Sequence, residues 1–144
     1  MTTVSQILQA KGTRVWSVSP DTTVFDALKL MAEKNLGALL VLEGEKLVGI
    51  FSERDYARKI ILQGKTSKET PVMEIMSTDV LYVRPEQSIE ECMALMTDKR
   101  IRHLPVLEGT KLVGLISIGD VVKAVISEKE FVIKQLENYI TGTR

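Results

Sequence analysis

Residues 42–49 read LEGEKLVG, and residues 107–114 read LEGTKLVG. These two stretches lie 65 residues apart and belong to a longer match. Without a gap, Pro20 aligns with Pro85 and the alignment continues to Ala57 on Val122, with 15 identities in 38 pairs. Unrelated sequences of ordinary composition would share about two or three residues over that length. The chain is therefore a tandem duplication, and its fold has to be one that two similar halves build together.

Each copy shows the same order of elements. Short β-rich segments at 15–18 and 80–83 come first, each ending before a proline. Apolar residues then recur at i, i+3, i+4 and i+7, which predicts amphipathic helices beginning after Thr23 and Ser88 as N-caps. The quoted stretches are tight turns between two apolar strands, typical of a hairpin. A further helix is expected from Ser52 and from Ser117.

Each half is thus strand, helix, strand, strand, helix, a mixed α/β fold of the α+β type. One such unit is too small to bury its sheet alone, so we expect the two repeats to pack as a pseudo-twofold pair. We place the first repeat, with its lead-in and connector, at 1–70 and the second at 71–144. Segments 4–8 and 72–76 lead into the copies, and a long C-terminal helix carries Val132, Leu136 and Tyr139 along one face.

Composition excludes several classes of protein. Apolar residues make up 44% of the chain, and 19 basic residues balance 19 acidic ones. A zero net charge argues against binding nucleic acid through bulk phosphate attraction. A membrane span needs about 20 apolar residues in succession, and the sequence has no such run. The N-terminus has no signal-peptide pattern and Cys92 is the single cysteine, so we expect a reducing compartment, the cytoplasm.

The repeat unit resembles the CBS domain, and a tandem pair resembles a Bateman module. The resemblance is carried by Leu-Val-Gly-Ile-Phe-Ser-x-x-Asp at 47–55 and by His-Leu-Pro-Val-Leu at 103–107, and it covers roughly residues 13–127. It implies a non-enzymatic regulatory module that binds an adenine nucleotide, such as AMP, ATP or NAD, in the cleft between the repeats. It also implies a homodimer and a regulated partner protein that the sequence does not identify.

The segments Ser52-x-x-Asp55 and Ser117-x-x-Asp120 have two interpretations. One is a capping box, in which serine caps the helix and the carboxylate reaches back to the serine N–H. The other comes from the resemblance, in which the aspartate accepts the ribose hydroxyls and the serine lies near the phosphate. A helix N-terminus suits a phosphate, and the two interpretations are compatible. An anion near Arg54 would offset its unfavourable place at a helix N-terminus.

By the resemblance, each nucleotide cleft joins the aspartate of one repeat to the lead-in residues of a strand in the other. The residues expected in the main cleft are Ser52, Arg54, Asp55, Thr78, Val80, Leu81, Arg100, Ile101, Arg102 and His103. Those of the second, weaker cleft are Thr13, Val15, Trp16, Leu36, Gly37, Ala38, Ser117 and Asp120. We expect residues 100–103 to alternate sides as a strand does, and we expect few cations around Asp120.

Other functions compete with this interpretation. The alternative is a structural dimerisation module whose clefts are empty or degenerate, which Asn35, Gly37 and Gly119 favour for one cleft. We expect no catalytic residues and no enzyme activity, because the sequence shows no nucleophile and base in a catalytic pattern. We also expect no metal site, since His103 and Cys92 have no partners at ligand spacing, and Cys92 falls at an apolar helix position.

Overall fold

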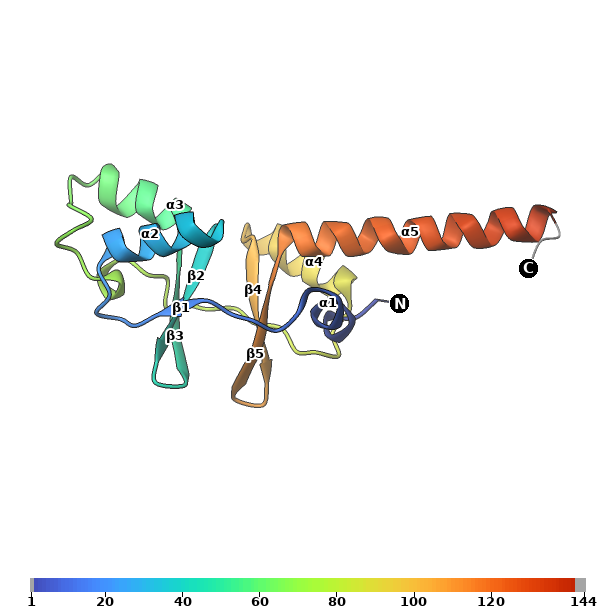
Figure 1. The fold of residues 1–144 in the computed structure, drawn as a ribbon, viewed down its shortest axis with the longest axis horizontal. Coiled ribbons are helices and arrows are strands. Elements are labelled where there is room, and N and C mark those ends of the chain that lie inside the picture. The colour runs from blue at the N-terminus through green and yellow to red at the C-terminus, as the bar shows by residue number, and fades with distance from the viewer. Residues whose placement is uncertain (1, 142–144) are drawn as a thin grey trace. The chain divides into compact units, whose positions relative to one another are not determined.

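A computed structural model describes residues 2–141 and shows a mixed α/β fold (Figure 1). In chain order, the elements are α1 (Val4–Lys11), β1 (Ser17–Val18), α2 (Val24–Lys34), β2 (Ala38–Glu43), β3 (Lys46–Ser52), α3 (Glu53–Tyr56), the π-helix η1 (Ala57–Ile61), the 3-10 helix η2 (Val72–Glu74), α4 (Ile89–Lys99), β4 (His103–Glu108), β5 (Lys111–Ser117) and α5 (Ile118–Thr141). The repeated helix, strand, strand, helix order and the long C-terminal helix predicted from the sequence are confirmed.

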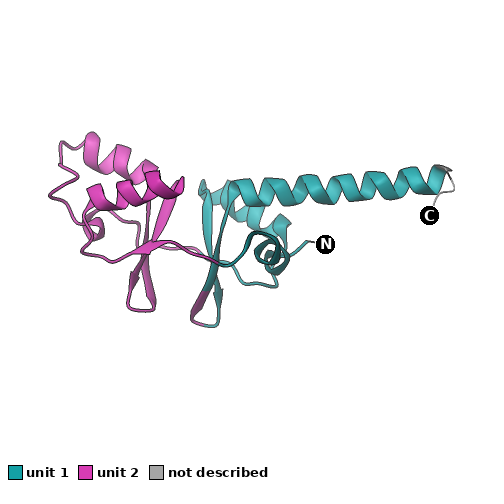
Figure 2. Ribbon diagram, in the orientation of Figure 1, with its two compact units in different colours: residues 1–13, 82–109, 113–144 teal, residues 14–81, 110–112 magenta. Residues whose placement is uncertain are grey.

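The chain forms two compact units that differ from the two sequence repeats (Figure 2). Unit 1 comprises residues 1–13, 82–109 and 113–144, and unit 2 comprises residues 14–81 and 110–112. The lead-in helix α1 therefore packs with the second repeat, whereas the segment before the second repeat packs with the first. Boundaries drawn at the repeats, 1–70 and 71–144, describe the duplication but cut through both packing units.

Each lead-in segment packs with the repeat other than its own, and we call these two segments, 2–11 and 70–77, the exchanged segments. Matching backbone hydrogen bonds hold them in both units. In unit 1, the N–H of Val4 donates to the carbonyl of Gln87 at 2.8 Å, and the N–H of Ile89 donates to the carbonyl of Thr2 at 3.1 Å. The second bond satisfies a donor at the start of α4 that the helix itself leaves unpaired. The equivalent bonds in unit 2 are Val72 N–H to Thr22 O at 2.7 Å and Val24 N–H to Thr70 O at 2.9 Å.

The exchanged segments also explain the glycine of each LVG block. A Cβ on Gly114 would lie 2.6 Å from Cδ2 of Leu8, and one on Gly49 would lie 2.5 Å from Sδ of Met76. Leu8 and Met76 occupy equivalent places in the two lead-in segments. Each β-hairpin therefore carries a glycine where the lead-in side chain crosses it, and a separate apolar core fills each unit.

The first strand of the repeat forms fully in only one copy. In unit 2, β1 pairs in parallel with β2 through Ser17–Leu40 and Val18–Val41, and β2 pairs antiparallel with β3. In unit 1, the expected strand at 80–83 is reduced to a single parallel bridge between Val83 and Val106. The residue equivalent to Leu40 is Pro105, which has no N–H to donate to a neighbouring strand. The prediction of a second short strand is therefore wrong.

The ends of the helices agree with their sequence signals. Thr23 and Ser88 cap α2 and α4 as predicted, each accepting from the N–H three residues on. Both helices end at a left-handed residue, Asn35 with φ 56° and Arg100 with φ 55°. Strand β4 begins at His103, so Arg100, Ile101 and Arg102 precede the strand, as the sequence indicated. A left-handed residue at 100 is needed to turn the chain out of α4. None of the helices in the described part of the chain is long and apolar enough to cross a membrane.

Candidate functional site

Asp55 is a buried carboxylate in a capping box at the junction of β3 and α3. It is 8% exposed. The N–H and the Oγ of Ser52 donate to Asp55 Oδ2 at 2.9 and 3.0 Å, and the N–H of Asp55 donates back to Ser52 Oγ at 3.2 Å. Oδ1 has looser partners, Lys59 Nζ at 3.3 Å and Ser77 Oγ at 3.5 Å. One oxygen thus holds the helix start, while the other faces Ser77 and Lys59, whose ammonium also donates to the carbonyl of Ile75 at 2.9 Å.

Asp120 repeats this arrangement in unit 1 with a closer cation. The Ser117 N–H donates to Asp120 Oδ2 at 2.8 Å, and the N–H of Asp120 donates to Ser117 Oγ at 3.1 Å. Lys11 Nζ lies 2.6 Å from the same Oδ2 and donates to the carbonyl of Leu115 at 2.9 Å. Burial acts to raise the pKa of Asp120, but the hydrogen bonds from Lys11 and Ser117 and the charge of Lys11 outweigh it, so the pKa is lowered.

Two residues expected in the second cleft, Asp120 and Trp16, each have a cation close by within their own unit. Besides Lys11 on Asp120, the ring of Trp16 in unit 2 has Lys34 Nζ at 4.4 Å and the guanidinium carbon of Arg14 at 5.2 Å from its centre. Both distances are typical of cation–π contacts. Lys11 beside Asp120 was not expected from the sequence, while the number of cations in a cleft that joins the two units stays a prediction. Lys11 comes from the exchanged helix α1, and the side chain of Lys34 folds back from the end of α2, so neither was visible as a local pattern.

His103 lies in the electrostatic surroundings of Asp120. Its pKa is lowered first by burial and then by the positive charges of Lys11 and Arg102, against an opposing effect of Asp120. The imidazole is therefore neutral near pH 7 and offers one donor and one acceptor to a ligand. It is not a fixed cation for phosphate binding.

The residues that lead into β2 and β4 lie beside the aspartate of their own repeat. The N–H of Glu53 donates to the carbonyl of Gly37 at 3.1 Å, and the N–H of Ile118 donates to the carbonyl of Arg102 at 2.8 Å. These equivalent bonds bring each Ser-x-x-Asp segment next to its own strand. The assignment of residues 100–103 to Asp55, and of Val15, Trp16 and residues 36–38 to Asp120, joins the two units and stays a prediction.

The remaining predicted residues differ in exposure. Arg54, Thr78, Leu81, Arg100, Arg102 and Thr13 are exposed, whereas Ser52, Val80, Ile101, His103, Val15, Trp16, Leu36, Gly37 and Ser117 are half-buried and Ala38 is buried. In the residues at 100–103, the arginines are exposed and Ile101 and His103 are half-buried. The two-sided character expected there is present, although the backbone is not a strand.

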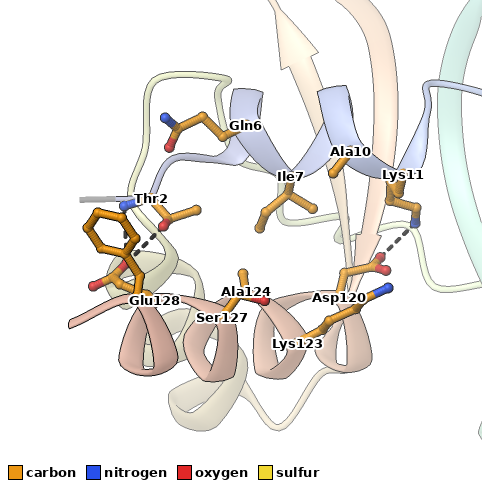
Figure 3. A pocket seen from close by; sticks show the side chains of 11 residues that line it. Thr2, Gln6, Ile7, Ala10, Lys11, Asp120, Lys123, Ala124, Ser127 and Glu128 are labelled. Atoms are coloured by element: carbon orange, nitrogen blue, oxygen red, sulfur yellow. Dashed lines mark hydrogen bonds and ion pairs between the residues drawn. The ribbon is translucent and has the colours of Figure 1, made fainter. Parts of the chain in front are cut away.

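A cavity that the sequence did not predict lies between α1 and the first half of α5 (Figure 3). Its volume is about 490 Å³, within the range of small-molecule sites. The Lys11–Asp120 ion pair closes one end, and the hydrogen bond from Thr2 Oγ1 to Glu128 Oε2, 2.8 Å long, closes the other. Ile7, Ala10, Ala124 and Phe131 supply its apolar wall. It was missed because α1 and α5 are far apart in the sequence.

Sequence reasoning also missed three polar neighbours of the aspartates, Lys11, Lys59 and Ser77. Lys59 has a local signal, since it lies four residues after Asp55 on the same helical face. Lys11 and Ser77 had none, because they come from the lead-in segment of each unit. Among the described residues, no group of acidic, histidine or cysteine side chains is placed to hold a metal ion. Cys92 is buried, and burial together with Glu91 and Glu90 raises the pKa of its thiol to about 11.

Comparison with known proteins identifies the class. The family model of the CBS domain matches residues 4–62 and 72–127. A solved structure of a protein with CBS domains from Burkholderia ambifaria MC40-6 is 60% identical, with a TM-score of 0.86, over 88% of this chain and 95% of that one. The mitochondrial CBS domain-containing protein CBSX3 of Arabidopsis thaliana is 44% identical over 98% of this chain and 73% of its own length. The CBS domain-containing protein YhcV of Bacillus subtilis is 37% identical over 81% of this chain and 83% of its own length.

The chain belongs to the CBS domain family. It carries two CBS domains, which confirms the resemblance seen in the repeats. CBS domain proteins are generally regulatory and non-catalytic, and none of the relatives named above bears the name of an enzyme.

Proposed function

We propose that this protein is a regulatory module that binds an adenine nucleotide of the AMP, ATP or NAD type through its Ser-x-x-Asp segments. One observation carries the proposal: Asp55 is a buried carboxylate with one oxygen held by Ser52 and the other in longer contacts with Lys59 at 3.3 Å and Ser77 at 3.5 Å. Two adjacent ribose hydroxyls are good donors to such a carboxylate.

The partners of Asp55 suggest how a ligand would enter. Lys59 is more than a third exposed, so its ammonium can leave Oδ1 at 3.3 Å while it keeps the hydrogen bond to the carbonyl of Ile75 at 2.9 Å. A ribose hydroxyl would then donate to Oδ1 and release the Lys59 ammonium toward the phosphate. The predicted contributions of Arg100, Arg102 and His103 to the same ligand would come from unit 1.

A second candidate function also has support in the structure. Both aspartates already have a serine and a lysine as partners within their own unit, so neither needs a ligand to be satisfied. The chain could therefore act as a structural dimerisation module with empty clefts. The two functions differ in one measurable property, the response of the protein to adenine nucleotides.

Thermal unfolding with AMP, ATP and NAD tests the proposal. A ligand at 100 times its dissociation constant adds about 2.7 kcal/mol to the free energy of unfolding. For a chain of this size, the melting temperature would rise by about 5–10 °C. Asp55→Asn, which keeps the shape of the cap but removes the charge, should abolish most of the rise. If none of the three nucleotides at millimolar concentration changes the melting temperature, the empty module is favoured instead.

We also propose that the chain is a homodimer that acts on a partner protein. Large apolar side chains remain exposed on equivalent helices of the repeats, among them Ile61 at 58% and Ile126 at 53%. Exposed patches of this kind are typical of protein interfaces. A nucleotide would act by favouring one arrangement of the module that the partner recognises. Sedimentation at micromolar concentration tests the dimer, and a single species of 16 kDa would contradict it.

A further inference from the structure

The second half of α5 continues past the rest of unit 1 (Figure 1). Large apolar side chains on this helix are exposed. The CBS family model ends at residue 127, whereas α5 continues to Thr141. On this helix Val122, Ile126, Ile133, Leu136 and Ile140 are 46%, 53%, 55%, 57% and 81% exposed. We call these five residues the α5 stripe.

The α5 stripe has the spacing of a coiled-coil seam. Its residues follow one another at intervals of 4, 7, 3 and 4, and the interval of 7 divides into 3 and 4 at Lys129. An alternation of 3 and 4 is the heptad pattern that keeps one face of a helix against a partner helix. The seam spans 18 residue steps, which is roughly 27 Å of helix. That length is enough for a specific helix pair.

Unit 1 itself leaves this seam uncovered. Ala124 faces α1 across the cavity (Figure 3), and Phe131 also lines that cavity. Val121 and Val125 pack into or against the core of the unit. At 100° per residue, the stripe lies nearly opposite to the face that contacts α1. The side chains that α5 uses for its own unit and those of the stripe are therefore different sets.

The charges along the stripe favour a second copy of the helix in antiparallel orientation. When residue 126 of one helix lies opposite residue 136 of the other, the pairing is centred near residue 131. Lys123 then lies beside Glu137 of the other copy, and Lys129 beside Glu130. Both pairs occur twice by symmetry. A parallel pair would instead place Lys129 against Lys129 within the seam, where like charges are unfavourable.

We propose that α5 of two chains pair antiparallel along the α5 stripe, centred near residue 131. The inference rests on the proposed homodimer and specifies one interface within it. Nucleotide binding at the Ser-x-x-Asp segments does not require this interface.

Disulfide cross-linking tests the orientation. The double variant Ile126→Cys/Leu136→Cys should form a covalent dimer under mild oxidation, because each new thiol faces the other position across the seam. Each single variant should stay largely uncross-linked, and so should the control Ile126→Cys/Lys134→Cys, which moves one thiol off the seam. The native Cys92 does not interfere, since it is buried and its pKa is about 11. Efficient cross-linking of the single Leu136→Cys variant would show parallel pairing and overturn the proposal.

Sedimentation of Leu136→Lys tests the energetic contribution of the stripe. Each chain places this residue in the seam, so two charges would be buried per dimer, and we expect the dissociation constant to rise by about 100-fold. Gln135→Lys, one position off the seam, should leave it unchanged. The variant should still fold, because Leu136 is 57% exposed within its own chain. A wild-type dimer that Leu136→Lys does not weaken would overturn the helix pairing but leave the homodimer standing. A monomeric wild type would overturn both.

Discussion

Replacement of Gly114 by alanine should destabilise the protein through a clash with the exchanged helix α1. The new Cβ would lie 2.6, 3.0 and 3.4 Å from Cδ2, Cδ1 and Cγ of Leu8, so the whole end of that side chain has to move. Leu8 is 6% exposed and belongs to the core of unit 1, which leaves it little space. Overpacking of this kind costs about 1–3 kcal/mol, and Gly114 has no positive φ to add a backbone cost.

A double-mutant cycle with Leu8→Ala isolates this contact. Leu8→Ala alone should cost about 2–5 kcal/mol, because it leaves a cavity. In the Gly114→Ala/Leu8→Ala double variant, the new methyl group enters the space that Leu8 leaves. The double variant should therefore lose about 1–2 kcal/mol less than the sum of the two single losses. Urea denaturation of the four proteins supplies the free energies of unfolding.

Gly109→Ala is the matched control for that cycle. Gly109 has φ 64°, and an added Cβ there would have no atom within 4 Å. Alanine at this position should cost about 1–2 kcal/mol through backbone strain alone, and its effect should add to that of Leu8→Ala. If Gly114→Ala and Leu8→Ala were also additive within about 0.5 kcal/mol, Leu8 would not lie on Gly114 and the exchange of α1 would be refuted.

Three further predictions concern the titration of His103, the end of α4 and the nucleotide site. His103 is the only histidine, and its pKa is lowered in the folded protein, so stability should fall as the pH drops below about 6.5, by at most about 1.4 kcal/mol per pH unit. His103→Gln should remove this dependence in urea titrations between pH 7.5 and 5.5, and an unchanged slope would contradict it. Arg100→Gly should raise the free energy of unfolding by about 0.5–1 kcal/mol by relieving a positive φ, whereas Asn35→Gly should change it less, because asparagine tolerates this conformation. In calorimetric titrations with AMP and NAD, Asp55→Ala should weaken binding by about 30- to 150-fold, or about 2–3 kcal/mol. Asp120→Ala should have a smaller effect, since Lys11 already occupies its carboxylate at 2.6 Å, and equal losses would contradict the ranking.

Local sequence patterns predict most of the helices and strands of this fold. The repeat and its elements were predicted from three local features: the two LEG-x-KLVG stretches, the helical spacing after Thr23 and Ser88, and the apolar strands. These signals are readable because each depends on residues close in the chain: a side chain caps the N–H three residues on, and an apolar face repeats every turn. The capping boxes at Ser52 and Ser117 were predictable for the same reason, and the structure shows both.

Contacts between segments far apart in the sequence could not be predicted from local patterns. The 3.6-residue period identifies α1 as a helix, but it carries no information on which repeat that helix joins. The bond of Lys11 to Asp120, 109 residues away, therefore came only with the folded chain, as did the cavity between α1 and α5. The absence of the expected strand at 80–83 also depends on a distant pairing, because the residue of β4 opposite it is Pro105, which has no N–H to donate.

The aspartates of the site show how these two kinds of information combine. The repeated Ser-x-x-Asp segment identifies both positions by sequence alone, since a cap and a ribose contact both need a carboxylate three residues after the serine. Their difference in charge surroundings comes from elsewhere in the chain: Asp55 has a lysine of its own helix, and Asp120 has one from the exchanged lead-in segment. Local chemistry is set by neighbours in sequence, whereas the electrostatic environment of a buried group is set by whatever the tertiary fold places against it.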